Sequence, residues 1–175
     1  MSLDPDDCRR FFEEAATYTD PVSDEVALTF ERIWIGVGDQ IRRTLDDDDL
    51  IVSALRRVAR PYDGPPVPVW RGQSRADFDA GKLGISWALS REAASTYGRC
   101  HEWNRRGGMV ILHAVAPATA VITVPRTGLG AAADALLAEI LIDIKQLPDV
   151  HLVEEINDPP TPWERELAAF ARPPL

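Results

Sequence analysis

A proline-rich stretch at residues 61–66 separates two parts of this chain that have different hydrophobic periods. Before it, the apolar side chains of residues 26–45 recur every three or four positions, which is typical of an amphipathic helix. After it, short apolar and β-branched runs are separated by Gly, Pro and Asp, which is typical of strands. Because proline lacks a backbone N–H and ends helices, the sequence predicts an α+β protein whose helices come mostly first.

The expected elements follow from these patterns and from their capping residues. Helices are predicted at residues 6–16, from Ser23 as N-cap to residue 45, at 50–60, from Ser90 as N-cap to residue 97, at 130–137, and in the tail. Strands are predicted at residues 67–71, 85–89, 109–115, 120–124, 138–142 and 151–156. Several of these strands lie too close in sequence for a crossover helix, so a mixed, largely antiparallel sheet is expected.

The length of 175 residues, of which 45% are hydrophobic, suits one domain with a sizeable core. We expect a single domain over residues 1–175. Within it, an acidic helical N-terminal part at residues 1–60 precedes a strand-rich core at 67–156 and a short tail at 159–175.

The net charge of −9 is concentrated in residues 1–49, which hold 14 Asp or Glu against 5 Lys or Arg. A surface of that sign repels phosphate backbones, so nucleic acid is not expected as a partner of this part. The chain has neither an apolar run long enough to span a bilayer nor a signal-peptide pattern, so a cytoplasmic protein without a membrane segment is expected. The two cysteines and three histidines lack metal-type spacing, so no metal site is expected.

A candidate site begins at Arg71, which ends the first predicted strand. A guanidinium offers a planar set of donors that fits phosphate or carboxylate oxygens. The following Gly72 has no side chain and lets a ligand approach the backbone. The alternative for Arg71 is an ion pair with Asp77 or Asp79 at the end of the strand.

Two further strands carry polar residues in apolar surroundings. Ser86 can donate one hydrogen bond to a neighbouring carboxylate, and Trp87 can form a flat apolar wall, although both also fit ordinary sheet positions. Glu139 lies in an apolar strand, where a carboxylate either faces water or stabilises positive charge in a cleft of low dielectric. Arg71, Ser86 and Glu139 are therefore the candidate site residues.

In order and interval, three segments of the chain resemble the arginine–serine–glutamate type of the ADP-ribosyltransferase superfamily, which is found in bacterial toxins and in small bacterial and phage proteins. The segments are Trp70-Arg71-Gly72, Gly84-Ile85-Ser86-Trp87-Ala88-Leu89-Ser90 and Ala138-Glu139-Ile140-Leu141-Ile142-Asp143. The resemblance covers residues 67–156 and leaves the helical N-terminal part with only a general counterpart.

The resemblance implies a split, mixed-sheet fold that binds NAD in a cleft without a Gly-x-Gly-x-x-Gly motif, which this sequence also lacks. It implies that Arg71 holds the NAD phosphates and that Ser86 braces Glu139. Glu139 would bond the 2′-hydroxyl of the nicotinamide ribose and stabilise the positive charge that grows on the sugar as nicotinamide leaves. Gly72, Trp87 and Tyr97 would complete the NAD site, and Tyr97 equally suits plain packing.

Two positions depart from the family pattern. The hydroxyl expected two places after the first serine is replaced by Ala88. The second glutamate of arginine-modifying members, two places before the catalytic one, is replaced by Leu137. Arginine is therefore doubtful as the acceptor of ADP-ribose, and water, another amino acid of a protein or a small molecule remains open.

The expected function is that of an NAD-dependent ADP-ribosyltransferase or NAD glycohydrolase. A second hypothesis is a catalytically inactive module of the same fold that docks a basic partner through its acidic helices, because Ala88 and Leu137 have lost polar groups. A third is an NAD-using RNA 2′-phosphotransferase. The acidic balance of the chain argues against the third, which needs basic groups to hold a phosphorylated RNA end.

Overall fold

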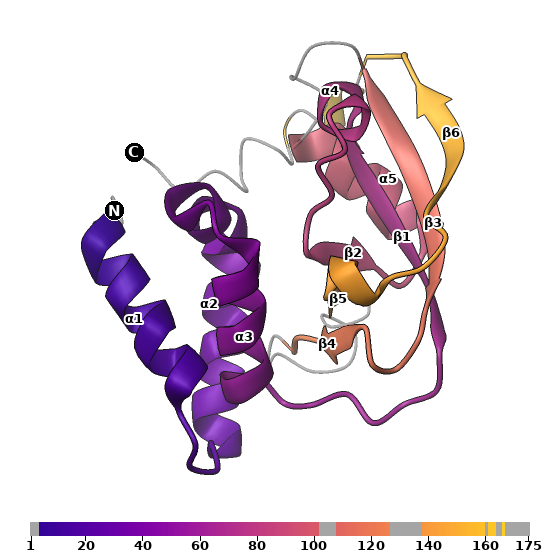
Figure 1. Cartoon of the computed structure of the whole chain (residues 1–175). Coiled ribbons are helices and arrows are strands. Elements are labelled where there is room, and N and C mark those ends of the chain that lie inside the picture. Colours follow the sequence, from indigo (N-terminus) through magenta and orange to yellow (C-terminus); the bar gives the residue numbers. More distant parts are fainter. Residues whose placement is uncertain (1–3, 102–107, 127–137, 160, 164–165, 167–175) are drawn as a thin grey trace.

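Helices and strands occupy two adjacent parts of the molecule (Figure 1). The computed structural model describes residues 4–101, 108–126, 138–159, 161–163 and 166. The helical part consists of α1 (Pro5–Thr17), α2 (Asp24–Leu45) and α3 (Asp48–Val58), which lie side by side. The sheet part follows at residues 67–156. In the part of the chain that is described, no helix combines the length and apolar character needed to cross a bilayer.

Side-chain caps define where the helices begin. The Ser23 Oγ accepts a hydrogen bond from the Val26 N–H at 3.4 Å, so the predicted cap of α2 is confirmed. Asp47, in the acidic run between α2 and α3, accepts from the Leu50 N–H at 3.1 Å. That run therefore starts a helix, and its carboxylates lie where the helix dipole favours negative charge.

The helical part and the sheet part share a hydrophobic core. α2 and α3 bury one face each, and α1 packs against α3 and α2. The shared core contains Phe12, Phe30, Trp34, Ile51 and Leu55 from the helices together with Ile85, Ile122 and Leu141 from the sheet part. The helices therefore cover one face of the sheet on the side of β4, β5 and β2.

Six strands form one sheet in the order β4-β5-β2-β1-β3-β6. Their bounds are β1 (Val67–Ser74), β2 (Ser86–Ala88), β3 (Met109–Ala116), β4 (Val121–Thr123), β5 (Glu139–Ile142) and β6 (His151–Ile156). All the described pairings are antiparallel, so the α+β class is confirmed and the parallel component of the expected mixed sheet is wrong. The reason is that the crossover through α5 joins β2 to β3, which both pair with β1 and are therefore parallel without being neighbours.

The strand pairing within the sheet is shortest between β2 and β1. β1 pairs with β3 along its whole length, whereas its register with β2 consists of the pair Trp70↔Ala88. The sheet is hydrogen-bonded throughout, and this junction divides it into β4-β5-β2 on one side and β1-β3-β6 on the other.

Helix α5 (Arg91–His101) crosses β1 at very short range. Its predicted cap is confirmed, because the Ser90 Oγ accepts from the Ala93 N–H at 3.1 Å. A Cβ added to Gly72 would lie 2.2 Å from the Ala94 carbonyl oxygen and 3.0 Å from the Cα of Gly98. Glycine is therefore required where the helix and the strand meet.

Two short elements were not predicted from the sequence. They are α4 (Arg75–Asp79), which follows β1, and the 3-10 helix η1 (Ile144–Gln146), which follows β5. Both are shorter than the window in which a hydrophobic period can be recognised. The helix expected at residues 130–137 and most of the tail lie outside the described residues.

Candidate functional site

The three predicted site residues lie on three neighbouring strands. Arg71 is on β1, Ser86 begins β2 and Glu139 begins β5, and these strands are adjacent in the order β5-β2-β1. In the β2–β5 register, Glu139 is opposite Ala88, two residues from Ser86 and on the same face of β2. Diagonal neighbours of this kind are within reach of a long side chain. The sheet therefore brings together residues that are 15 to 68 positions apart in the sequence.

Hydrogen bonds join these groups to one another and to α2. Ser86 and Trp34 are the side chains that lower the pKa of the Glu139 carboxyl by hydrogen bonding. The indole Nε1 of Trp34 also lies 3.3 Å from the Ser86 Oγ, toward which it donates. The guanidinium of Arg71 donates from Nη1 to the backbone carbonyl of Ser86. The structure thus brings Arg71, Ser86 and Glu139 into one neighbourhood, and the bracing of Glu139 by Ser86 stays a prediction.

The Glu139 carboxyl has an unusual acidity. Burial is the largest cause and raises its pKa from 4.5 to about 7, with a further upward contribution from Asp39. The hydrogen bonds from Ser86 and Trp34 and the positive charge of Arg71 oppose this rise. A carboxyl that titrates near neutrality among fixed donors is a frequent property of functional sites.

Arg71 is buried and held in one orientation. Its side chain donates from Nε to the Gln73 Oε1 at 2.9 Å, and only 9% of the residue is exposed. A Cβ added to Gly84 would lie 2.2 Å from Nη2 of Arg71, so the guanidinium rests directly on the backbone of this glycine. The carboxylate of Asp79 pairs with Arg75, and Asp77 lines the same pocket as Arg71.

Two residues expected at the NAD site serve packing instead. Trp87 alternates with Ser86 along β2, is 3% exposed and lies in the core on the other face of the strand, where its Nε1 donates to the Gly84 carbonyl. It cannot form a wall for a ligand beside Ser86. Gly72 is buried against α5, so its missing side chain makes room for the helix and not for a ligand.

Tyr97 reaches the site from α5. Its hydroxyl donates to the Asp39 Oδ2 of α2 at 2.9 Å, and the residue is 37% exposed. Burial of the hydroxyl, together with the charge of Asp39, raises the pKa of Tyr97 well above 10, and Glu139 and Arg71 are also among its electrostatic neighbours. The Tyr97–Asp39 bond therefore links α5 to α2 beside the carboxyl of Glu139.

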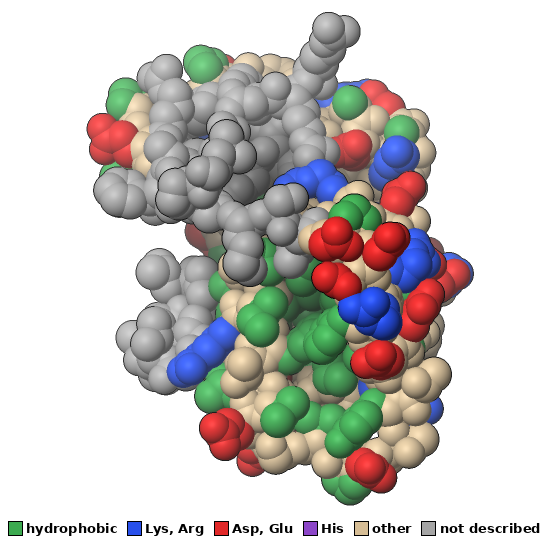
Figure 2. Space-filling model, turned by 90° about the vertical axis from the view of Figure 1, so that its left-hand side faces the viewer, with side chains coloured by type: hydrophobic (Ala, Val, Ile, Leu, Met, Phe, Trp, Pro, Cys, Tyr) green, Lys and Arg blue, Asp and Glu red, His purple; other side chains and the backbone are tan. Residues whose placement is uncertain are grey.

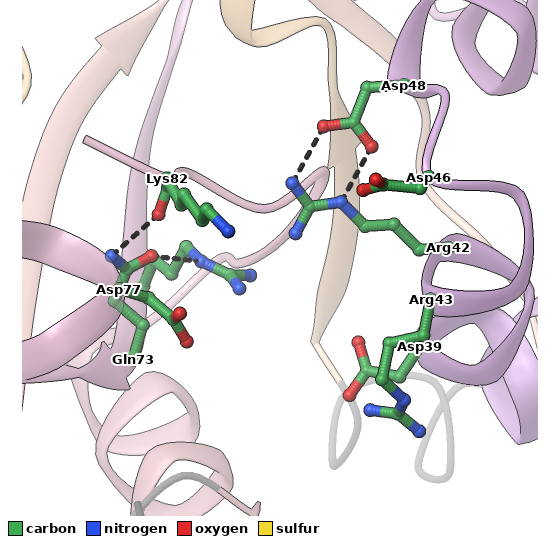
Figure 3. A pocket seen from close by; sticks show the side chains of 9 residues that line it. Asp39, Arg42, Arg43, Asp46, Asp48, Gln73, Asp77 and Lys82 are labelled. Atoms are coloured by element: carbon green, nitrogen blue, oxygen red, sulfur yellow. Dashed lines mark hydrogen bonds and ion pairs between the residues drawn. The ribbon is translucent and has the colours of Figure 1, made fainter. Parts of the chain in front are cut away.

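A pocket of about 240 Å³ continues from Arg71 toward the end of α2 (Figure 3). Its lining contains four positively charged and four negatively charged side chains and one amide. These are Arg42, Arg43, Arg71 and Lys82, then Asp39, Asp46, Asp48 and Asp77, and Gln73. Arg42 is held by Asp48 at 2.7 Å and by the carbonyl of Leu83 at 2.7 Å. The pocket thus lies between the helical part and the sheet part.

Sequence reasoning missed the contribution of α2 to this site. Trp34 fits the apolar stripe of the helix, and Asp39, Arg42 and Arg43 fit its polar face, so each has an ordinary local explanation. A signal was present in Gly36 and Gly38, because two glycines in the interior of a helix cost stability and call for a packing reason.

The described residues contain no group of three or more His, Cys, Asp or Glu side chains that could hold a metal ion. Comparisons of the chain with known protein families, with curated proteins and with solved structures find no match. The site is therefore interpreted from its own geometry and from the motif resemblance.

Proposed function

We propose that this protein cleaves the bond between nicotinamide and ribose in NAD and transfers ADP-ribose to water or to another acceptor. The observation that supports the proposal is the convergence of Arg71, Ser86 and Glu139 from three adjacent strands, with the Arg71 guanidinium bonded to the Ser86 carbonyl and Glu139 diagonally opposite Ser86. The same three residues carry the motif resemblance. The proposed class is an NAD-dependent ADP-ribosyltransferase or NAD glycohydrolase.

In the proposed reaction, the bond between C1′ of the ribose and the ring nitrogen of nicotinamide breaks. Both electrons of this bond go to nicotinamide, which leaves as a neutral molecule, and positive charge develops on C1′ and the ring oxygen. The carboxylate of Glu139 stabilises that charge because it lies beside the reacting sugar and is partly removed from water. Water or the acceptor then attacks C1′ and releases a proton.

The remainder of the dinucleotide has a place beside this centre. Arg71 presents a permanently charged guanidinium between Glu139 and the pocket, where it can neutralise a phosphate. Arg43 and Lys82 line the same pocket farther along (Figure 3). A phosphate group at Arg71 would place the nicotinamide ribose toward Glu139 and the adenosine half toward the pocket.

The direct test is release of nicotinamide from NAD, followed by chromatography. We expect Glu139→Gln to lower the rate by about a hundredfold or more, since it removes the charge that acts in the transition state. Glu14→Gln, at an exposed position on α1, is the matched control and should retain full activity. Absence of any turnover that depends on Glu139, with water and with a set of acceptors, would contradict the proposal.

The pH dependence of the reaction provides a second test of the same proposal. Glu139 must be ionised to stabilise positive charge, and its pKa is about 7. The rate should therefore fall about tenfold for each pH unit below 7 and level off above it. A rate that stays constant from pH 5 to pH 8 would show that this carboxyl does not act in its charged form.

A second candidate function is the inactive docking module, and an exposed apolar surface favours it. On α1 and α2, the side chains of Phe11, Val26 and Ile33 are 51%, 54% and 50% exposed. The view of the molecule from the side of these helices shows hydrophobic side chains gathered among acidic ones (Figure 2). Calorimetry distinguishes the functions, because binding of NAD without consumption supports the module and consumption supports the enzyme.

A further inference from the structure

The carboxylate of Glu139 has an incomplete set of donors within the sheet. On the face of β2 that it shares, the neighbouring positions are Ser86 and Ala88, and Ala88 is directly opposite Glu139. Ser86 supplies one hydroxyl donor, and Ala88 supplies none. A second donor to this carboxylate therefore has to come from outside β2.

Trp34 of α2 places an indole N–H beside Ser86 and Glu139. The residue is 3% exposed and belongs to the core shared by the helices and the sheet. Its single indole N–H donates to the Ser86 Oγ at 3.3 Å, and Trp34 is also among the groups that lower the pKa of Glu139. A buried indole N–H requires a partner, and here that partner belongs to the candidate site.

The helix is shaped to hold the indole in this place. Gly38 lies one turn after Trp34, and a Cβ added there would lie 2.8 Å from Cε2 and 3.0 Å from Nε1 of the indole. The ring thus occupies the space that a side chain at residue 38 would need. Gly36 on the same helix has no heavy atom within 4 Å of the equivalent position, so its neighbourhood is open.

We propose that Trp34 is a positioning residue, which holds the Ser86 hydroxyl beside the Glu139 carboxylate through its indole N–H and thereby extends the catalytic machinery from the sheet into the helical part. This inference rests on the proposed function of Glu139. It assigns to the acidic helices a role inside the site. Deletion or displacement of α2 would then impair the chemistry even where the sheet stays folded.

Other charged groups also face Glu139 and have to be held constant in a test. They are Asp39 on α2, Arg71 on β1 and the hydroxyl of Tyr97 on α5. Asp39 raises the pKa of Glu139, and Arg71 lowers it. Trp34→Phe changes none of these charges and retains an aromatic ring, so its electrostatic effect comes from the loss of the N–H.

The test measures the titration of Glu139 directly, by carbon NMR of its side-chain carboxyl, in the wild type and in Trp34→Phe. Because a hydrogen bond to the charged form lowers a carboxyl pKa, its loss should raise the pKa of Glu139 by about one unit. Phe12→Leu, which removes volume from the same core away from Glu139, should leave the pKa unchanged. Identical titration of Glu139 in the wild type and in Trp34→Phe would overturn the inference.

A pair of glycine variants repeats the test without removing the indole. Gly38→Ala should displace the ring and raise the pKa of Glu139, whereas Gly36→Ala, on the same helix, should leave it unchanged. Equal pKa values of Glu139 in the two alanine variants would count against the role of Trp34. If Trp34→Phe fails to fold, this pair still decides the question.

Turnover of NAD separates this inference from the proposed function. If the wild type is active, the rising limb of the pH–rate profile of Trp34→Phe should move to higher pH by the pKa shift that NMR measures. At pH 6 the variant should therefore be about tenfold slower than the wild type. A merely structural role would lower the rate equally at all pH values and would overturn the inference. If the wild type releases no nicotinamide, the proposed function fails, and the NMR titration still decides whether Trp34 holds Ser86 beside Glu139.

Discussion

The helical part and the sheet part contribute to the candidate site in different ways. The sheet part supplies Arg71, Ser86 and Glu139, whose positions follow from strand order and register. The helical part supplies Trp34, which donates to Ser86, and Asp39, which accepts from Tyr97 and whose charge raises the pKa of Glu139. Strand order and register thus bring the three site residues together. The helical part adds a hydrogen-bond donor and a negative charge around them.

Polar contacts of two buried carboxylates, those of Glu31 and Asp143, connect the helical part with the sheet part. Glu31 of α2 is 1% exposed and accepts bonds from the side chain of Arg60, from the backbone N–H of Arg126 at 3.0 Å and from the Thr123 hydroxyl at 3.5 Å. Asp143, after β5, accepts from Arg56 of α3 at 3.1 Å. The hydrogen bonds of Glu31 to Thr123 and Arg126 and the Arg56–Asp143 pair thus join the helices to the sheet, whereas the Glu31–Arg60 pair lies within the helical part.

The largest expected effect comes from breaking the Glu31–Arg60 pair. Arg60→Met leaves the carboxylate of Glu31 buried without its main cationic partner, which costs about 3–5 kcal/mol in the free energy of unfolding. Urea denaturation at pH 7 measures it. The double variant Glu31→Gln with Arg60→Met should regain a large part of the loss, because Gln remains an acceptor for the Arg126 N–H. An Arg60→Met variant of wild-type stability would show that the buried carboxylate of Glu31 does not depend on this pair.

The next largest effect concerns Glu139 and depends on pH. Its pKa is about 7 in the folded protein against 4.5 unperturbed, so the folded state binds a proton more tightly and loses stability as pH rises from 4.5 through 7. Two and a half pKa units correspond to about 3 kcal/mol. Glu139→Gln should therefore be more stable than the wild type at pH 8 by up to about 3 kcal/mol and should match it at pH 4. Parallel stability curves of the two proteins from pH 4 to pH 8 would refute the raised pKa.

The sequence predicted the local structure and the three sheet residues better than the surroundings of the site. Caps such as Ser23 and Ser90 and the strands with Arg71 and Glu139 carry their signals within a few residues, and the structure confirms these elements. A charged group in an apolar strand is conspicuous, so it can be identified as a candidate without knowledge of the fold.

The contribution of α2 could not be predicted, because its residues fit their own helix. Trp34 has the spacing of a core residue, and its role depends on where the indole N–H points. Trp87 was predicted to lie in the site because it adjoins Ser86 in sequence. Alternation along the strand places its side chain on the other face of β2, and the strand register is needed to show which face holds the site.

A smaller effect is expected at the crossing of α5 over β1, which lies within the sheet part. Gly72→Ala would place a Cβ 2.2 Å from the Ala94 carbonyl oxygen, and overpacking of this kind costs about 1–3 kcal/mol. Because Arg71 directly precedes Gly72, the same substitution should also shift Arg71 and lower the proposed NAD turnover. Gly36→Ala is the control, since the space around it is open and alanine favours the helix by about 1 kcal/mol. Equal thermal midpoints for the two variants would mean that α5 moves away from β1 without cost.

The smallest effect is expected for an exposed ion pair inside the sheet part, between Arg91 at the start of α5 and Glu154 of β6. The two charged groups lie 2.6 Å apart, but their side chains are 49% and 39% exposed. Water and salt screen such pairs, so Arg91→Ala should lower the free energy of unfolding by less than about 1 kcal/mol, and the difference should shrink in high salt. Urea denaturation at low and high ionic strength measures both. A loss as large as that of Arg60→Met would contradict this comparison, because burial would then not be the property that distinguishes the ion pair of the helical part from that of the sheet part.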